Sequence, residues 1–483
     1  MKSKCLFVDD YHVESMQEIK RVMHQPQKKG AVIKPEKTWE HALQTRCAPQ
    51  WDEKEKIFKH WIFSKGHMNY LESANGIDWD RPILRQKMFN GSLENNIVTF
   101  DPRLEYADNM MENIVYDPDD PDEKRRYKGF WGCLEDRKPL FSPDGIHLTC
   151  KDDFKLPSND ESNLSYDRQS KTFIATLKVG GPHGRAHNIW ISKDFKNWDL
   201  ISQFHADDED QLLGKINIEH RFGDDSRSRP FYNMPETYNV DVYNLGIFKY
   251  EGLYIGMPSM YHQTGKVTGN WKNFDDYEMS EEARKAMKRD GDWGGFHPVQ
   301  LMCSRDLINW ERLGNRQPFI DLSPMGEGVY DLMTIMPPSS PIVKDDELWF
   351  YYTGLQRYGG FFACRRSEDD GAICLATLRR DGFISLDAGE MPGTVLTKPF
   401  RSEGTKLNVN MDATHGYLSV EVLDIEGNSL AVSKPSDEDN VNVEVRWDPV
   451  EFNQFNNQQI RLRFNLKNAK LYSFRVEAHG RTI

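Results

Sequence analysis

A short polar phrase recurs along the first three quarters of this chain and limits its fold more than any other feature. It occurs at 72–79, 142–148, 192–198 and 304–310, and each copy follows a run of strand-forming residues. In every copy a Ser is followed two residues later by Asn or Asp, the residue types that favour tight turns. The phrase predicts a repeated hairpin corner, and with a degenerate fifth copy at Ser367–Gly371 it predicts five of them.

The repetition predicts the architecture. A unit of about 40 to 50 residues with several short strands cannot cover its own apolar faces and has to stack on its neighbours. Radial stacking of such units gives a β-propeller. The copies are unevenly spaced, with the largest gap between Ser192 and Ser304, so we expect insertions between blades. The alternative is that the phrase marks an ordinary turn beside a core Trp, and four ordered copies favour the repeat.

The pattern changes after about residue 390. Residues 417–423 and 460–464 alternate between apolar and polar side chains, which is typical of an antiparallel sandwich. We therefore expect an all-β protein, with a five-bladed β-propeller over residues 1–390 and a C-terminal β-sandwich over residues 391–483. Cys5–Val8 is expected to close the ring against the last blade, and Ser280–Lys288 is expected to form a capped helix inside an insertion.

Charge and cysteine usage restrict the partners. The net charge of −13 argues against nucleic acid and anionic membranes, and is compatible with a neutral, hydroxyl-rich substrate. The seven Cys residues show neither zinc-ligand spacing nor a disulfide framework. No metal or cofactor is required by the sequence, although several acids around one axis could hold a structural calcium ion. The chain is expected in the cytoplasm if it is complete, and in the periplasm or outside the cell if a leader was removed.

Candidate acids lie where inner strands of a propeller would begin. Cleavage of a glycosidic bond needs two carboxyl groups, one protonated and one ionised. Asp241 interrupts a strand-like run between Val240 and Val242, where a charge is costly unless it is paired or functional. We take Asp241, Asp160 and Glu40 as the catalytic candidates, with their individual roles open. An outward-facing polar position is the plain alternative for Asp241.

A second group of candidates is suited to binding the substrate. The turn at 182–187 carries two His residues and one Arg, which can donate hydrogen bonds to sugar hydroxyls or to a carboxylate. Arg185 is the expected anchor, together with His183 and His187. Glu327 and Asp331 complete the expected binding residues. A surface hairpin with incidental His residues is the alternative reading of the turn.

The repeated corners, the opening Leu6–Tyr11 and the terminal Leu471–Phe474 resemble the five-bladed propeller glycoside hydrolases related to families 32 and 43. That resemblance implies a pocket-shaped, exo-acting site with three acids. The Asn-Asp-Pro-Asn-Gly, Arg-Asp-Pro and Glu-Cys motifs of family 32 are absent, as is the Ala-Asp-Pro start of family 43. No catalytic role can therefore be transferred to a particular residue from these families.

These observations predict a glycoside hydrolase that acts on a plant or algal oligosaccharide. Two alternatives stay open. A glycoside phosphorylase of similar fold would use Arg185 and His187 to hold phosphate in place of the attacking water. A carbohydrate-binding protein without catalysis would bind sugars and release none. The oligomeric state is not indicated by the sequence.

Overall fold

The computed structural model describes residues 4–64, 67–99, 111–132, 136–151, 153–276, 279–359 and 369–477. This part of the chain is nearly all β and contains two α-helices, α1 (Asp208–Gly223) and α2 (Glu281–Asp290). Neither of them is long and apolar enough to cross a membrane. The prediction of a β-rich protein is confirmed.

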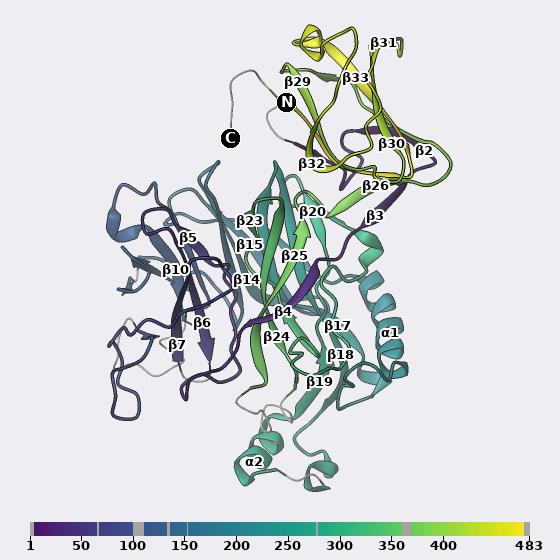
Figure 1. Ribbon diagram of the computed structural model, residues 1–483. Helices are drawn as coiled ribbons and strands as arrows, with labels where there is room; N and C mark the ends of the chain where they lie inside the picture. The colour runs from purple at the N-terminus through teal and green to yellow at the C-terminus, as the bar shows by residue number, and fades with distance from the viewer. Residues whose placement is uncertain are drawn as a thin grey trace.

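Five antiparallel sheets of four or five strands make up the larger part of the molecule (Figure 1). They are numbered here in chain order. The first sheet contains β5 (Gln50–Asp52), β6 (Ile57–Ser64), β7 (His67–Ser73) and β8 (Ile97–Val98). The second contains β9 (Asn113–Tyr116), β10 (Tyr127–Trp131), β11 (Lys138–Ser142) and β12 (Thr149–Cys150). The third contains β13 (Ser162–Asp167), β14 (Thr172–Gly181), β15 (Gly184–Ser192) and β16 (Asp199–His205).

The last two of these sheets carry an extra strand each. The fourth contains β17 (Asn239–Tyr250), β18 (Leu253–Val267), β19 (Asp292–Phe296), β20 (Met302–Ser304) and β21 (Trp310–Arg312). The fifth contains β22 (Thr334–Met336), β23 (Ile342–Lys344), β24 (Glu347–Leu355), β25 (Gly371–Arg379) and β4 (Gln27–Ile33). The first strands β5, β9, β13 and β17 contact one another in turn, so they form the inner layer.

The repeated phrase forms the same corner in the first four sheets, after the third strand of each. In the third sheet the amide of Phe195 donates to Ser192 Oγ at 2.9 Å, and the amides of Lys196 and Asn197 donate to Asp194 Oδ1 at 2.9 and 2.8 Å. The corners at Ser73, Ser142 and Ser304 repeat this pattern. The fifth copy begins at Ser367, outside the described residues.

The corners also join neighbouring sheets. Trp61 of the first sheet donates to the carbonyl of Gly145 in the second, and Ser202 of the third donates to the carbonyl of Leu307 in the fourth. Phe130 of the second sheet stacks on Phe195 of the third. Tyr351 of the fifth sheet donates to the carbonyl of Gly76 in the first, at 2.6 Å. The sheets therefore follow one another in a closed cycle.

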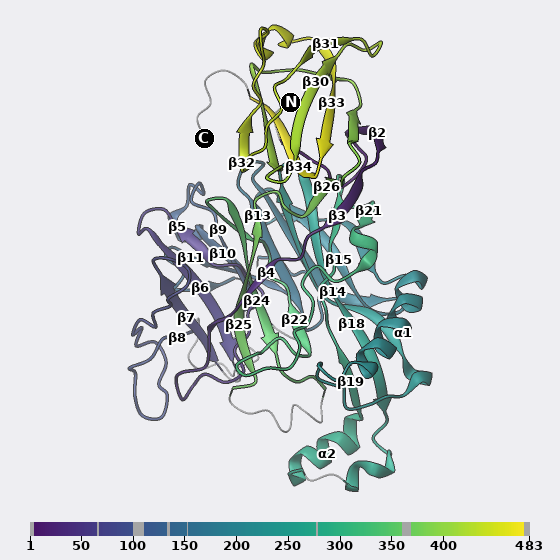
Figure 2. The same cartoon turned by 45° about the vertical axis from the view of Figure 1, so that its right-hand side comes forward.

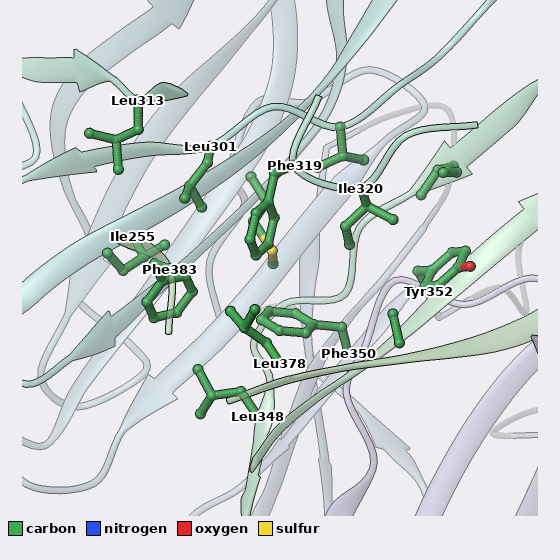
Figure 3. Close-up of a cluster of buried hydrophobic side chains, with 14 of the residues drawn as sticks. Ile255, Leu301, Leu313, Phe319, Ile320, Leu348, Phe350, Tyr352, Leu378 and Phe383 are labelled. Atoms are coloured by element: carbon green, nitrogen blue, oxygen red, sulfur yellow. The ribbon is translucent and has the colours of Figure 1, made fainter. Parts of the chain in front are cut away.

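The fourth and fifth sheets complete this cycle through the large apolar cluster of Figure 3. Ile255 and Leu301 come from the fourth sheet and its connections, and Leu348 and Phe350 come from β24. All four side chains are fully buried. Burial of these apolar side chains away from water is the main force that holds the two sheets together.

Two six-stranded sheets pack face to face around a second apolar core, at the end of the molecule where both termini lie (Figures 1 and 2). One contains β1 (Cys5–Leu6), β3 (Lys20–Met23), β26 (Ile384–Ala388), β29 (Lys406–Asp412), β32 (Asp439–Glu444) and β34 (Ala469–Glu477). The other contains β2 (Val13–Gln17), β27 (Gly393–Thr397), β28 (Phe400–Arg401), β30 (Tyr417–Leu423), β31 (Ser429–Val432) and β33 (Gln459–Lys467). Alternate residues of β30 and β33 are buried, as the period-two pattern predicts.

The N-terminal segment corrects one expectation. Cys5–Val8 does not close a ring against the fifth sheet, because Cys5 and Leu6 pair with Phe474 and Ser473 of β34. It is β4, at Gln27–Ile33, that forms the outer strand of the fifth sheet by pairing with β25. The strands β1, β2 and β3 thus belong to the two six-stranded sheets, and the division near residue 390 stays a prediction.

The two helices are insertions at the fourth sheet. The predicted helix is confirmed as α2, with the Ser280 side chain accepting from the amide of Ala283, and it projects from the end opposite the six-stranded sheets (Figure 1). The longer helix α1 was not predicted. Its start carries a capping box, Asp207 with Asp210, but its apolar residues do not form one stripe, since Leu212 and Ile216 are exposed while Gly214 and Ile218 are buried.

Candidate functional site

A buried acid and a partly exposed base face each other between the third and fourth sheets. Arg185 of β15 donates from Nη1 to Oδ2 of Asp241 of β17 at 2.8 Å, and the two side chains are 34% and 3% exposed. The other oxygen, Asp241 Oδ1, is buried and accepts no hydrogen bond from a described residue. Burial raises the pKa of Asp241, and Arg185 opposes that shift only in part. The protonated form is therefore favoured more than in a free carboxyl group, and one of its oxygens accepts from no described residue.

A glycine allows this close approach. Gly184 has a φ of 120°, and a Cβ atom built on it would lie 2.7 Å from Asp241 Oδ2. A side chain at this position would be strained by the backbone and would collide with the carboxylate. The turn before β15 therefore brings its backbone against Asp241 only because residue 184 has no side chain.

Aromatic side chains surround the pair. The Arg185 guanidinium lies over the rings of Tyr243 and Tyr261, at 5.5 and 5.1 Å from their centroids. His297 stacks on Tyr261 at 4.7 Å, and Tyr358 meets His297 edge-on at 4.1 Å. Burial, together with the nearby cations, holds the pKa of His297 well below its ordinary value, so the imidazole is neutral. The walls of the site are therefore apolar rings with a few polar edges, a lining typical of small-ligand sites.

A second ion pair lies beside the first. Lys178 of β14 is 2% exposed, and its Nζ lies 3.0 Å from Oδ1 of Asp160, which is 47% exposed. The same Nζ lies 3.8 Å from the centre of the Tyr243 ring. His187 Nε2 donates to the Tyr243 carbonyl at 3.2 Å, and burial lowers the pKa of His187 to about 3. Tyr243 thus connects the predicted residues Asp160, His187 and Arg185 into one cluster.

Next to this cluster lies a network of ion pairs whose charged side chains are all buried. Arg46 donates to both oxygens of Glu161, at 2.5 and 2.6 Å, and Asn244 donates to Glu161 at 2.8 Å. Arg137 and the hydroxyl of Ser162 both donate to Glu112, at 3.0 and 2.6 Å. Burial acts against both carboxylates, but Arg46 outweighs it and lowers the pKa of Glu161, whereas the pKa of Glu112 is raised. We call Arg46, Glu161, Glu112 and Arg137 the buried quartet.

Sequence reasoning missed most of these partners. Lys178, Arg46, Glu112 and His297 are not among the residues predicted from the sequence. The available signal was positional, because Glu112 directly precedes β9 and Glu161 directly precedes β13, at the starts of inner strands. Lys178 had a weaker signal, a cation in the middle of an apolar strand. Such a residue is costly to bury without a partner.

The other predicted residues lie elsewhere in the described chain. Glu40 is buried and accepts from Arg81 Nε at 2.8 Å and from the amide of Glu36 at 2.9 Å. Asp331 accepts from Lys28 at 2.6 Å and from the Tyr352 hydroxyl at 2.8 Å. Two further residues have surface positions: Glu327, which is exposed, and His183, 3.3 Å from Asp208. Their roles as catalytic or binding residues stay predictions.

Among the described residues, one group of side chains could hold a metal, at the outer edge of the fourth sheet and not in this cluster. The donor atoms of Asp9, Cys303 and Glu311 lie within 4.8 Å of one another. Arg305 also pairs with Asp9 at 2.8 Å, so the carboxylate already has a cationic partner. The expectation of a structural calcium ion stays open.

The cluster around Asp241 can perform acid–base chemistry on a neutral ligand. It offers a protonatable carboxyl at Asp241, an ionisable carboxyl at Asp160 that solvent can reach, and hydrogen-bond donors at Arg185 and Lys178.

Comparisons with known proteins find similar solved structures and nothing else. No family model and no curated protein matches the chain. A structure from work on the family 130 mannoside phosphorylases and glycoside hydrolases has a TM-score of 0.40 and 12% identity, covering 78% of this chain and 97% of that chain. A family 32 β-fructofuranosidase from Bombyx mori, with sucrose, has a TM-score of 0.38 and 10% identity, with coverages of 93% and 94%. An N-acetylgalactosamine deacetylase from F. plautii has a TM-score of 0.37 and 12% identity, with coverages of 75% and 95%. All of these TM-scores are below 0.5, so the likeness decides neither the fold nor the activity of this chain.

Proposed function

We propose that this protein is a glycoside hydrolase whose active site is the cluster around Asp241 and Arg185. The observation that carries the proposal is the state of Asp241, a buried carboxyl with a raised pKa and one oxygen without a partner. A general acid has to hold its proton near neutral pH and present it to the leaving oxygen. The scaffold in this proposal is a five-bladed β-propeller with a C-terminal β-sandwich, which the closed cycle of sheets supports.

Asp241 is the general acid in this proposal and Asp160 is its ionised partner. The proton of Asp241 passes to the glycosidic oxygen as the bond to the anomeric carbon breaks. Asp160, held by Lys178, either removes a proton from the attacking water or attacks the anomeric carbon itself. Glu40 is left out of the pair because Arg81 and a backbone amide already occupy its carboxylate.

Substrate binding is assigned to the groups around this pair. Arg185 donates to sugar hydroxyls, and the partly exposed ring of Tyr243 supplies an apolar face against which a pyranose can pack. A neutral plant or algal oligosaccharide, cleaved from its end, is the substrate class. The net charge of −13 is compatible with a neutral sugar.

The test is a screen of the purified protein against aryl glycosides and plant and algal oligosaccharides, with and without phosphate. Chromatography of the released sugars separates the outcomes. Release without phosphate, lost in Asp241→Asn, is the expected result. Release that depends on phosphate identifies a phosphorylase, and sugar binding without any release identifies a binding protein; either one overturns the proposal.

A further inference from the structure

A second polar pocket lies on the flank of the fourth sheet, beside the last turn of α1. Its volume is about 260 Å³. The lining residues come from α1, from the segment that follows it, and from loops next to β19 and β22. They are Asn217, His220, Arg221, Asp224, Arg227, Phe296, Pro298, Gln317, Pro318, Asp321 and Leu322. All of them belong to the described chain, and none belongs to the cluster around Asp241.

Arg221 is a buried cation without a carboxylate partner among the described residues. It is 4% exposed, and its guanidinium donates from Nε to the Ser228 carbonyl at 2.8 Å and from Nη2 to the Leu332 carbonyl at 2.5 Å. Nη1 makes no such bond, yet it is not among the fully buried polar atoms, so it is open to the pocket. The guanidinium, which lies over the Phe296 ring at 5.1 Å, therefore keeps one nitrogen that makes no recorded hydrogen bond and is not fully buried.

The acids in the pocket wall are already occupied. Asp321 accepts from Arg227 Nη2 at 2.9 Å and from the Leu322 amide at 2.8 Å. Asp224 accepts from the amide and hydroxyl of Ser226, at 2.9 and 2.6 Å, and pairs with Arg227. Arg227 thus pairs with both carboxylates. They act on Arg221 only from a distance, and no described carboxylate makes a direct ion pair with it.

Burial of a cation without a counter-charge is costly, and an anion in the pocket would remove that cost. Burial, reinforced by Arg227, lowers the pKa of Arg221 to about 10. The planar guanidinium suits an oxyanion, whose oxygens can accept from adjacent N–H groups. The side chains of Asn217, His220 and Gln317 supply further donors around the same space.

We propose that this pocket binds a small oxyanion of the size of inorganic phosphate or sulfate, with Arg221 as its main ligand. The proposal is independent of the glycosidase activity, because it concerns a different set of residues and is tested by binding alone.

The test is isothermal titration calorimetry of the full chain with sodium phosphate and, separately, with sodium sulfate and sodium acetate. Thermal unfolding in phosphate and in chloride at equal ionic strength supplies a second measurement. Saturable binding at one site with a matching rise in Tm is expected. Binding of phosphate and sulfate identifies a tetrahedral oxyanion, whereas binding of acetate alone replaces it by a carboxylate and overturns the proposed class.

Two variants assign the binding to the pocket. Arg221→Met should abolish it. Gln317→Glu places a negative charge at the rim of the pocket without removing a recorded side-chain hydrogen bond, and should weaken binding at least about tenfold. Arg229→Met is the matched control, an exposed Arg on the same segment paired with Asp225, and should bind as the wild type does.

The proposal is overturned if the wild type shows no saturable binding, or if Arg221→Met and Gln317→Glu both bind as the wild type does. In that case the role of Arg221 is limited to its hydrogen bonds with the backbone carbonyls of Ser228 and Leu332. If Arg221→Met does not fold, Gln317→Glu alone decides the question.

Discussion

Two ion pairs lie next to each other in this protein, Arg46–Glu161 of the buried quartet and Arg185–Asp241, and they differ in how completely their carboxylates are satisfied. In the buried quartet, Arg46 binds both oxygens of Glu161, and the Glu161 side chain is 6% exposed. In the cluster around Asp241, one carboxylate oxygen of Asp241 accepts from no described residue, and solvent reaches the side chains of Arg185 and Asp160.

The difference separates support from chemistry. A saturated, buried ion pair has no free hydrogen-bonding capacity for a ligand, and its contribution is to fix the positions of the strands that carry it. A pair with a free oxygen and a solvent-accessible partner can exchange a proton and bind a hydroxyl. The Arg46–Glu161 pair therefore fixes the start of β13, whereas in the proposed function the Asp241 cluster acts on the substrate. Glu112 of the quartet is an exception, since its buried Oε1 accepts from no described residue. The predictions below are ordered by their expected effect on stability.

The largest effect is expected from breaking the quartet. Arg46→Met leaves Glu161 buried without its counter-charge, and should lower the free energy of unfolding by about 3–5 kcal/mol. Urea denaturation followed by fluorescence measures it. The double variant Arg46→Met with Glu161→Gln should recover part of the loss, because the unpaired charge is then gone. A loss below about 1 kcal/mol, the size of an ordinary surface pair, would contradict the scaffold role.

The next effect is expected at the glycine beneath Asp241. Gly184→Ala adds a Cβ atom 2.7 Å from Asp241 Oδ2, on a backbone with φ of 120°. It should cost about 1–3 kcal/mol of stability and displace the Arg185–Asp241 pair. Gly180→Ala is the matched control on the same hairpin, since its added Cβ would meet nothing within 4 Å. Equal effects of the two substitutions would show that the close approach does not matter.

A smaller effect on the free energy of unfolding is expected from pH, and it has opposite signs at Asp241 and at Glu161. The pKa of Asp241 is raised in the native state above the ordinary value of 3.8, so the native protein keeps a proton that the unfolded chain has lost. The stability contributed by this group therefore falls as pH rises from about 4 through the native pKa. Over that interval the free energy of unfolding of Asp241→Asn should rise relative to that of the wild type.

The pKa of Glu161 is lowered below the ordinary value of 4.5. Its contribution is present above that value and is lost as pH falls toward the native pKa, so the penalty of Glu161→Gln should shrink in acid. Urea denaturation of both variants and the wild type across this pH range measures the two slopes. If the free energy of unfolding changed with pH in the same direction at both sites, the distinction between Asp241 and Glu161 would be contradicted.

The smallest effect on stability is expected at Asp160. Its side chain is 47% exposed, so Asp160→Asn should change the free energy of unfolding by no more than about 0.5 kcal/mol. The turnover of the identified substrate should nevertheless fall by about a hundredfold or more, because the ionised partner is lost. Activity close to that of the wild type would remove Asp160 from the catalytic pair.

The sequence predicted the parts of the fold that local chemistry determines. The Ser and Asp of each corner bond to the backbone within five residues, so these turns are visible in a single sequence, as is the capped helix α2. The pairing of Cys5 with Phe474 depends on chain ends that are far apart in sequence, and no local pattern encodes it.

The candidate site could be predicted only in part for the same reason. Asp241 was found because a charge inside an apolar strand is a local anomaly, and Arg185 because it lies on a Gly-rich turn. Lys178 and Tyr358 join them only through the arrangement of separate strands and loops. The bonds that occupy Glu40, from Arg81 and from its own turn, likewise became visible only in the folded chain.

The most direct test compares two buried acids of the fourth sheet. Asp241→Asn removes the proposed acid, and Asp292→Asn removes an equally buried carboxylate that accepts from the Tyr232 hydroxyl at 2.8 Å and has no part in the proposed chemistry. With the oligosaccharide identified by the screen, sugar release at equal folded fraction should fall by about a hundredfold or more in the first variant and stay close to that of the wild type in the second. Undiminished release by Asp241→Asn would contradict the assignment of the chemistry to this cluster.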